Sequence, residues 1–182
     1  SALTQDMMAC YQCAGNECWH RDVLMEKAEL FKPSPLLSQW CKTKLRLSPF
    51  KDRTGNLHMD LRAGMMNFSI VGRGGTKKQR IDYITYDLIN NERETLAEEF
   101  NSMFAGSYQA QIAGETGIDI CEEGKDKGQV FKKLMKYHSN KQIIFFGDDC
   151  QKGGNDYPFV VKLRENDICY SVNNPDETFN IL

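Results

Sequence analysis

Two acidic residues, Asp148 and Asp156, stand where carboxylates can hold a hard cation. Asp148 follows a short apolar run, residues 142 to 146, and Gly147, and Asp156 comes eight residues later, after a glycine-rich turn. Carboxylate oxygens are the ligands that Mg²⁺ prefers, and the carboxyl end of a buried strand is where open α/β sheets bind ligands. We therefore predict a Mg²⁺ site with Asp148 as first ligand and Asp156 as second. The alternative is an acidic loop that only faces water.

A lysine upstream of these carboxylates is the second candidate for chemistry. Lys127 lies in Gly124-Lys125-Asp126-Lys127-Gly128, at the start of a helix that the apolar spacing predicts for residues 127 to 138. The ammonium and the positive end of the helix can together neutralise a phosphate. We expect Lys127 to neutralise a phosphate near the two aspartates.

The elements that must position these residues fall into two groups. Alternation predicts a β-hairpin over residues 57 to 71, helical spacing predicts helices over 77 to 90 and 92 to 104, and two more strands follow at 108 to 113 and 117 to 121. Since strands and helices are each half apolar, an antiparallel sheet with helices on one face is the economical arrangement. Residues 23 to 47 are expected to be helical in part, with Pro33 and Pro35 as interruptions.

From residue 125 onward the pattern changes to that of an α/β unit. The helix at 127 to 138 precedes the nearly all-apolar strand at 142 to 146, which is typical of a buried parallel sheet. Residues 168 to 172 and 175 to 182 are predicted as one more strand and a short helix. The boundary between the two units is expected near residues 121 to 124.

Three segments resemble one known family. The pairing of Gly124-Lys125-Asp126-Lys127 with Phe145-Phe146-Gly147-Asp148 and Gly153-Gly154-Asn155-Asp156 resembles the last two motifs of the haloacid-dehalogenase (HAD) superfamily, and the G-G-N-D form is typical of eukaryotic phosphomannomutases. The segment from Asp60 to Arg73 is similar to the cap hairpin of that family. Gln79-Arg80-Ile81-Asp82-Tyr83 is similar to its E-R-I-E-F helix.

The resemblance implies a fold and a set of roles. It implies an α+β cap at residues 14 to 121, an antiparallel sheet with helices on one face, joined to a reduced HAD-like α/β core made of residues 1 to 13 and 122 to 182. It implies a phosphorylated hexose as ligand and Mg²⁺ as cofactor. The residues that would grip the hexose phosphate on the cap are Arg62, Met65, Asn67, Arg73 and Arg80, and Asp119 would hold sugar hydroxyls. Arginine suits phosphate because its planar fork gives two parallel hydrogen bonds, although a single arginine can equally be an exposed salt-bridge residue.

This sequence also departs from the family pattern. Gly117 stands where the family has a serine, so one polar contact to the sugar is lost. The resemblance implies phosphoryl transfer through the first aspartate of a D-x-D motif, and no D-x-D occurs in these residues. Autonomous catalysis is therefore not expected, and the core is expected to lack its nucleophile half.

Three functional classes follow from this absence. The first is a non-catalytic module that binds a phosphosugar or a protein. The second is one part of an active phosphomannomutase whose nucleophile half lies on another chain or outside these residues. The third is a structural protein that dimerises through its cap. Because an incomplete parallel sheet leaves an open edge, either a second copy or another partner is expected to cover it.

Composition narrows the partners and the compartment. The 182 residues carry a net charge of -2, and basic residues are matched by acidic ones, so neither nucleic acid nor an anionic membrane is an expected partner. No apolar run is long enough for a bilayer span, and a cytoplasmic location is the default expectation. The seven cysteines are expected to be reduced. The set Cys10, Cys13, Cys18 and His20 has a spacing open to zinc, but half-buried cysteines on two short strands are the favoured interpretation.

Overall fold

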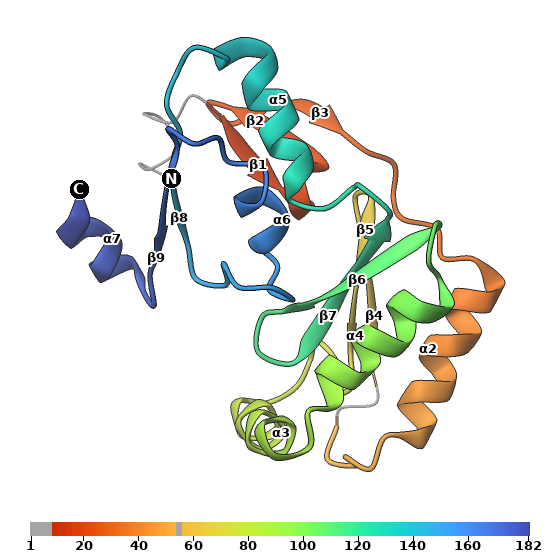
Figure 1. The fold of residues 1–182 in the computed structure, drawn as a ribbon. Coiled ribbons are helices and arrows are strands. Elements are labelled where there is room, and N and C mark those ends of the chain that lie inside the picture. The colour runs from red at the N-terminus through yellow and green to blue at the C-terminus, as the bar shows by residue number, and fades with distance from the viewer. Residues whose placement is uncertain (1–8, 54–55) are drawn as a thin grey trace.

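The computed structural model describes residues 9–53 and 56–182 (Figure 1). Residues 1–8, which the sequence assigned to the core with residues 9 to 13, lie outside the described residues. The described chain contains three sheets: one of three strands, one of four and one of two. The four-stranded sheet and its helices form one end of the molecule, and the other two sheets lie toward the opposite end.

The four-stranded sheet is antiparallel throughout, with the order β4-β5-β7-β6. The strands are β4 (Met59–Arg62), β5 (Met65–Ser69), β6 (Tyr108–Ala113) and β7 (Gly117–Glu122). The helices around it are α2 (Pro35–Leu47), α3 (Lys77–Asn90) and α4 (Glu92–Met103). The predicted hairpin, the two predicted helices and the two later strands are therefore confirmed.

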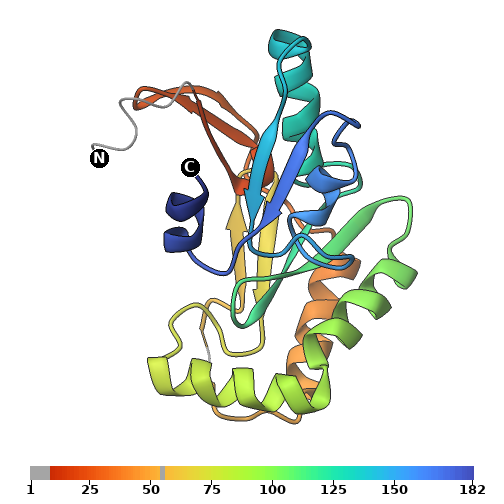
Figure 2. The same cartoon turned by 60° about the vertical axis from the view of Figure 1, so that its left-hand side comes forward.

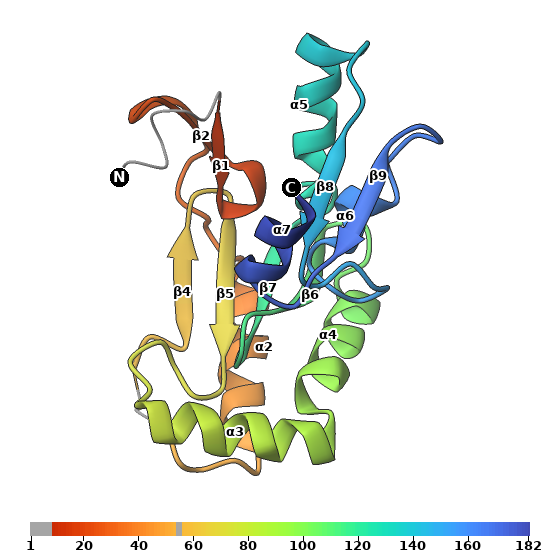
Figure 3. The ribbon, with the colours of Figure 1, turned by 90° about the vertical axis from the view of Figure 1, so that its left-hand side faces the viewer.

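Alternation along these strands separates a buried face from a polar one. Met66, Phe68, Ile118 and Ile120 on β5 and β7 are at most 1% exposed and belong to the main hydrophobic core, which also includes residues of α2 and α4. Side chains two apart on a strand share a face, so these four point to the same side of the sheet. The helices cover this side, and Figure 3 shows α2, α3 and α4 grouped beside the sheet.

Aromatic rings hold the helices on the sheet. The Trp40 ring on α2 makes edge contacts with Phe68 at 5.9 Å and with Phe100 at 5.1 Å between ring centroids. Phe100 also stacks on Phe104 at 4.5 Å. Such pairs add about 0.5 to 1.5 kcal/mol each beyond the burial of their area. The sheet that carries the polar face is therefore fixed from behind by packed rings.

The prediction of partial helix over residues 23 to 47 is wrong for the part before the prolines, residues 23 to 31. Val23–Lys27 form strand β3, which pairs antiparallel with β2 (Glu17–His20). The two strands meet at Arg21 and Asp22, which both have positive φ, as a two-residue turn of the hairpin type requires. This local turn sets the strand pairing, and the short stretch before the prolines is too brief for a stable helix of its own. Helix α2 beyond the prolines is confirmed.

The three-stranded sheet packs against helix α5. Strand β1 (Cys10–Gln12) pairs with β2, and a single helical turn, η1 (Cys13–Gly15), joins them. The Gln129 side chain on α5 (Gly128–His138) donates to the Ala14 carbonyl at 2.8 Å. Lys133 donates to the Gly15 carbonyl at 3.2 Å and pairs with Glu26 at 2.6 Å. The limits of the predicted cap and core remain a prediction.

The C-terminal part contains the predicted parallel strands. Strand β8 (Ile144–Gly147) pairs in parallel with β9 (Ile168–Ser171), and α6 (Tyr157–Val160) lies between them in the chain. Helix α7 (Pro175–Ile181) closes the chain. Figures 1 and 2 show α7 on one side of the two strands and α5 with α6 on the other. In the described residues, no helix is long and apolar enough to cross a membrane.

Candidate functional site

The face of the four-stranded sheet that points away from the hydrophobic core carries two rows of mainly polar side chains. In the first row, Asp60, Asn67, Asp119 and Gln111 are register partners across all four strands. The neighbouring row consists of Arg62, Met65, Cys121 and Gln109. We call these eight residues the polar face. Four predicted site residues, Arg62, Met65, Asn67 and Asp119, therefore lie next to one another.

Two of the predicted arginines meet at one carboxylate. Arg62 Nε donates to Asp60 Oδ2 at 2.9 Å, and Arg62 Nη2 forms an ion pair with the same oxygen at 2.9 Å. Arg73 Nη1 also donates to this oxygen, at 2.6 Å. Arg62 is on β4, two residues after Asp60, so both share a face. Arg73 follows β5 in the chain, and its backbone N–H is bonded to the Leu57 carbonyl at 3.2 Å. Two guanidinium groups are therefore held together at the edge of the polar face.

The middle of the polar face is a hydrogen-bonded amide and carboxylate. Asn67 Nδ2 donates to Asp119 Oδ1 at 2.8 Å. Burial raises the pKa of Asp119, while the Asn67 hydrogen bond and the nearby Arg62 and Lys127 charges act to lower it. Gly117 is required beside this pair, since a Cβ there would lie 2.8 Å from Asn67 Nδ2. The glycine that replaces the family's serine thus gives room to Asn67.

Arg80 does not join the other two arginines at Asp60 in the described structure. It is on α3, where its side chain is 49% exposed and its Nη1 is 3.9 Å from Glu115 Oε2. Met65 is 2% exposed and is the register partner of Arg62. The structure therefore brings Arg62, Met65, Asn67, Arg73 and Asp119 into one region and leaves Arg80 on the neighbouring helix.

Lys127 and the 148–156 loop form a second cluster. Lys127 Nζ lies 2.5 Å from Asp156 Oδ1 and donates to Asn155 Oδ1 at 2.8 Å. The Asp156 side chain is 6% exposed, and its Oδ2 accepts a bond from the Asp149 backbone N–H at 3.2 Å. Asp148 has no hydrogen bond or ion pair to any of the described residues. One carboxylate of the predicted pair is thus already neutralised, and the other is available.

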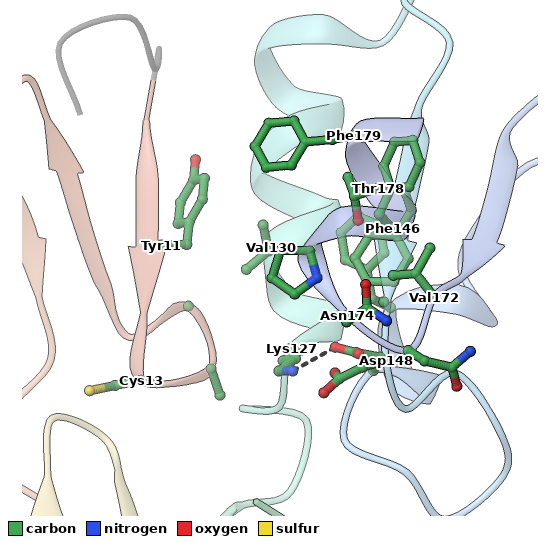
Figure 4. Close-up of a pocket in the computed structure, with 18 residues that line it drawn as sticks. Tyr11, Cys13, Lys127, Val130, Phe146, Asp148, Val172, Asn174, Thr178 and Phe179 are labelled. Atoms are coloured by element: carbon green, nitrogen blue, oxygen red, sulfur yellow. Dashed lines mark hydrogen bonds and ion pairs between the residues drawn. The ribbon is translucent and has the colours of Figure 1, made fainter. Parts of the chain in front are cut away.

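A hollow of about 770 Å³ opens above this cluster. Figure 4 shows Lys127 and Asp148 close together, with Val130, Phe146 and Phe179 above them and Tyr11 facing them across the space. Of the uncharged residues, Val130 is on α5, Phe146 on β8, Phe179 on α7 and Tyr11 on β1. The hollow therefore has apolar walls and a charged floor.

The polar face and Lys127 are joined through the segment that leads from β7 to α5. Gln109 Nε2 on β6 donates to Asp126 Oδ2 at 2.6 Å, and Asp126 Oδ1 accepts from the Gly128 backbone N–H at 2.8 Å. This bond ties the start of α5 to the edge of the sheet. The pKa of Asp119 responds to Arg62 and also to Lys127, which places both cations within electrostatic reach of one carboxylate.

The donor set suits Mg²⁺ better than zinc. Mg²⁺ typically uses one or two protein carboxylates together with water and substrate phosphate oxygens, and Asp148 and Asp156 both line the hollow. Among the described residues, no three His, Cys, Asp or Glu side chains are gathered so that they could hold a metal ion by themselves. Cys10, Cys18 and His20 lie on β1 and β2 and Cys13 on η1, which confirms the two short strands predicted for this segment.

Sequence reasoning missed Asp60 and Gln109. Both are polar residues on strands. Asp60 begins the segment that is similar to the cap hairpin but was given no role there, and Gln109 lies outside the segments that carried the resemblance. Asp60 had one available signal: it precedes Arg62 by two positions in an alternating strand, which puts a carboxylate and a guanidinium on the same face. Gln109 had none, because its partner Asp126 lies in a different element.

Comparison with known proteins agrees with these observations. The model of the family described as eukaryotic phosphomannomutase matches residues 42–182. The phosphomannomutase of Oryza sativa subsp. indica is 32% identical over 121 residues, which cover 66% of this chain and 47% of the relative. That of Drosophila melanogaster is 31% identical over 125 residues, covering 68% and 48%. The chain thus spans about half the length of the curated relatives it matches.

Solved structures agree on the fold alone. An IMP-bound mutant of the IMP-nucleotidase from Plasmodium falciparum superposes with a TM-score of 0.60 at 14% identity, covering 94% of this chain and 46% of that one. Its N-terminally truncated form, also with IMP, gives 0.55 at 15% identity, covering 90% and 44%. The family match covers far more than half of the residues and includes the polar face, Lys127 and the 148–156 loop. The chain belongs to the eukaryotic phosphomannomutase family.

Proposed function

We propose that this chain binds a phosphorylated hexose between the polar face and Lys127. The observation that carries the proposal is the meeting of Arg62 and Arg73 at one oxygen of Asp60, on the face whose Asp119 also feels Lys127. A phosphate monoester carries about 1.5 to 2 negative charges at neutral pH and accepts several hydrogen bonds. Two guanidinium groups with one carboxylate leave a net positive charge that such a group can satisfy.

The sugar would be held by the uncharged part of the polar face. Asn67 and Asp119 offer an amide and a carboxylate that can exchange hydrogen bonds with hydroxyl groups, and both are half-buried. Their mutual bond fixes the two side chains before the ligand arrives, which reduces the entropy lost on binding. A hexose that presents adjacent hydroxyl groups to this pair is therefore the ligand we expect.

Mg²⁺ would be held by Asp148 with Asp156 beside it. When bound, the ion would supply charge neutralisation to phosphate oxygens. The role of Lys127 in this arrangement is to hold Asp156 in place and to add positive charge at the floor of the hollow. Asp148 has no hydrogen bond or ion pair to any of the described residues, so its carboxylate is available to bind the ion directly.

We propose binding without phosphoryl transfer by this chain alone. These residues contain no D-x-D pair, which the family resemblance identifies as the nucleophile and its acid/base partner. A second candidate is one part of an active phosphomannomutase, interconverting mannose 6-phosphate and mannose 1-phosphate, whose nucleophile comes from elsewhere. Within the described residues β8 pairs with β9 along one edge only, and the hollow next to it has apolar walls.

Association with a second copy is a further part of the proposal. Helix α3 exposes Ile81 by 51% and Leu88 and Ile89 by 76% each. Positions 81, 88 and 89 share one face of a helix, and exposed apolar side chains on one face favour a protein partner. A homodimer through this helix would leave the polar face free for ligand.

Calorimetric titration with mannose 1-phosphate and glucose 1-phosphate in the presence of Mg²⁺ tests the function. We expect saturable binding of at least one hexose phosphate and no conversion to the 6-phosphate in the same samples. Glucose and mannose without phosphate are the matched controls and should bind far more weakly. Turnover that begins only after a chain carrying a D-x-D nucleophile is added would favour the second candidate, and the absence of any binding would refute both.

A further inference from the structure

Asp60 is the one carboxylate to which both arginines at the edge of the polar face are bonded. Three nitrogens converge on Oδ2: Arg62 Nε donates at 2.9 Å, Arg73 Nη1 donates at 2.6 Å, and Arg62 Nη2 forms an ion pair at 2.9 Å. The Asp60 side chain is 21% exposed, against 31% for Arg62 and 59% for Arg73. The carboxylate thus belongs to the least exposed of the three side chains.

Two guanidinium groups placed together without a counter-ion repel each other. At a separation of a few ångströms the repulsion of two like charges near a protein surface is of the order of 4 kcal/mol at an effective dielectric constant of 20. Arg73 is largely exposed and has a long flexible side chain, so in the absence of an anchor it would leave Arg62 for bulk water. The Asp60 oxygen that both arginines share offsets the charge repulsion and also anchors the Arg73 side chain.

We infer that Asp60 is a positioning residue that holds Arg62 and Arg73 as one preformed phosphate clamp. The inference rests on the proposed function, and it adds a residue that the family motifs did not point to. Asp60 uses Oδ2 for these bonds, so the remaining N–H groups of both arginines stay available for an anionic ligand, since each guanidinium has five donors. The ligand then meets two ordered cations and needs no rearrangement of them.

The neighbouring residues fit this role. Asp60 is the register partner of Asn67, which is itself bonded to Asp119. The clamp therefore begins one strand away from the proposed sugar-binding pair, on the same face. The position of the phosphate relative to the sugar is set by the spacing of strands β4 and β5, which in sheets is roughly 4.8 Å.

The test compares Asp60→Asn with the unchanged protein. Asparagine keeps an acceptor oxygen but removes the charge, and we expect mannose 1-phosphate affinity to fall by roughly three- to tenfold. Asp60→Glu restores the carboxylate and should recover part of the affinity. Asp82→Asn, which removes a carboxylate paired with Lys78 on exposed α3, is the matched control and should leave affinity unchanged.

A double-mutant cycle distinguishes positioning from a general structural role. Arg73→Ala should weaken binding by about fivefold in the unchanged protein and by less than about twofold in Asp60→Asn, since the unheld Arg73 contributes little. Equal effects in both backgrounds would overturn the inference. An affinity that is unchanged or higher in Asp60→Asn would also overturn it, because the carboxylate would then act only by neutralising charge.

NMR of the arginine side chains tests, in the absence of ligand, whether Asp60 holds Arg62 and Arg73 in place. In the unchanged protein the Nε–H groups of Arg62 and Arg73 should be ordered, and Asp60→Asn should make both mobile while Arg93, which is bonded to Asp87, stays ordered. If no hexose phosphate binds, the proposed function fails. The loss of order in Arg62 and Arg73 would then still support the role of Asp60, and retained order would overturn it.

Discussion

Replacing the three predicted phosphate-binding arginines one at a time by alanine should weaken hexose-phosphate binding in the order Arg62, Arg73, Arg80. The exposed fractions of the side chains, 31%, 59% and 49%, and their positions determine this order. A hydrogen bond to a charged group contributes about 1.5 to 3 kcal/mol when water is largely excluded. We expect about 2 kcal/mol for Arg62, which is roughly a thirtyfold loss of affinity.

Solvent lowers the values for the other two. Arg73 is more than half exposed, so we expect about 1 kcal/mol, or roughly a fivefold loss. Arg80 is bonded to neither Asp60 nor any residue of the polar face in the described structure, and we expect less than about 0.5 kcal/mol. The family resemblance assigned all three arginines to the phosphate. A small loss of affinity for Arg80→Ala would therefore support the contacts seen in the structure over the assignment from the motif.

Calorimetry at constant Mg²⁺ and constant ionic strength is the assay, because salt screens exposed charges strongly. Arg46→Ala is the control, since Arg46 is an exposed arginine in the last turn of α2. Its affinity should equal that of the unchanged protein. Equal losses at all three arginines, or the largest loss at Arg80, would refute the placement of the phosphate beside Asp60.

Three further predictions concern stability and its pH dependence. Lys127→Met should lower the free energy of unfolding by about 2 kcal/mol, because it leaves the Asp156 carboxylate unpaired; this value lies between those for exposed and buried ion pairs. Urea denaturation should show that stability recovers in the double variant with Asp156→Asn, and a single variant as stable as the unchanged protein would contradict this. Burial raises the pKa of Asp119 in the folded state, so its ionised form lowers the stability of the protein above that pKa. Asp119→Asn should therefore become more stable than the unchanged protein as pH rises, with no gain below about pH 4. A difference in urea midpoint that stays constant across pH would contradict this. Gly64→Ala should lower the free energy of unfolding by about 1 to 2 kcal/mol, because φ at residue 64 is +61° and the new Cβ would lie 2.4 Å from Asn16 Cγ. A thermal melt that matches that of the unchanged protein would show that the turn tolerates a side chain.

The elements of the four-stranded sheet could be predicted from the chain because their signals are local. Helix α3 begins at a capping box in which Thr76 and Gln79 exchange hydrogen bonds, and it ends at Asn91 with φ of +50°. The hairpin of β4 and β5 shows clear alternation around Ala63-Gly64. Here local propensity and the final packing agree, which is the condition for reading structure from sequence.

The rest depended on contacts between distant residues. The apolar residues of strand β3 predict a helix, whereas pairing with β2 decides the conformation of this segment. The difference in partners, Asp60 for Arg62 and Glu115 for Arg80, could not be read from motifs, since both arginines match the family pattern. The convergence of Arg62 and Arg73 on Asp60 required the turn after β5 to return Arg73 to the start of β4, and no local pattern encodes that return.

Shift mapping by NMR, with ¹⁵N-labelled protein titrated with mannose 1-phosphate, tests the central claim most directly. The account predicts saturable shifts with one dissociation constant at Asn67 and Asp119 on the polar face and at Lys127 across the site, while Leu88 on the exposed side of α3 does not shift. Shifts confined to one of these two groups, or no shifts at all, would contradict a ligand site formed by both.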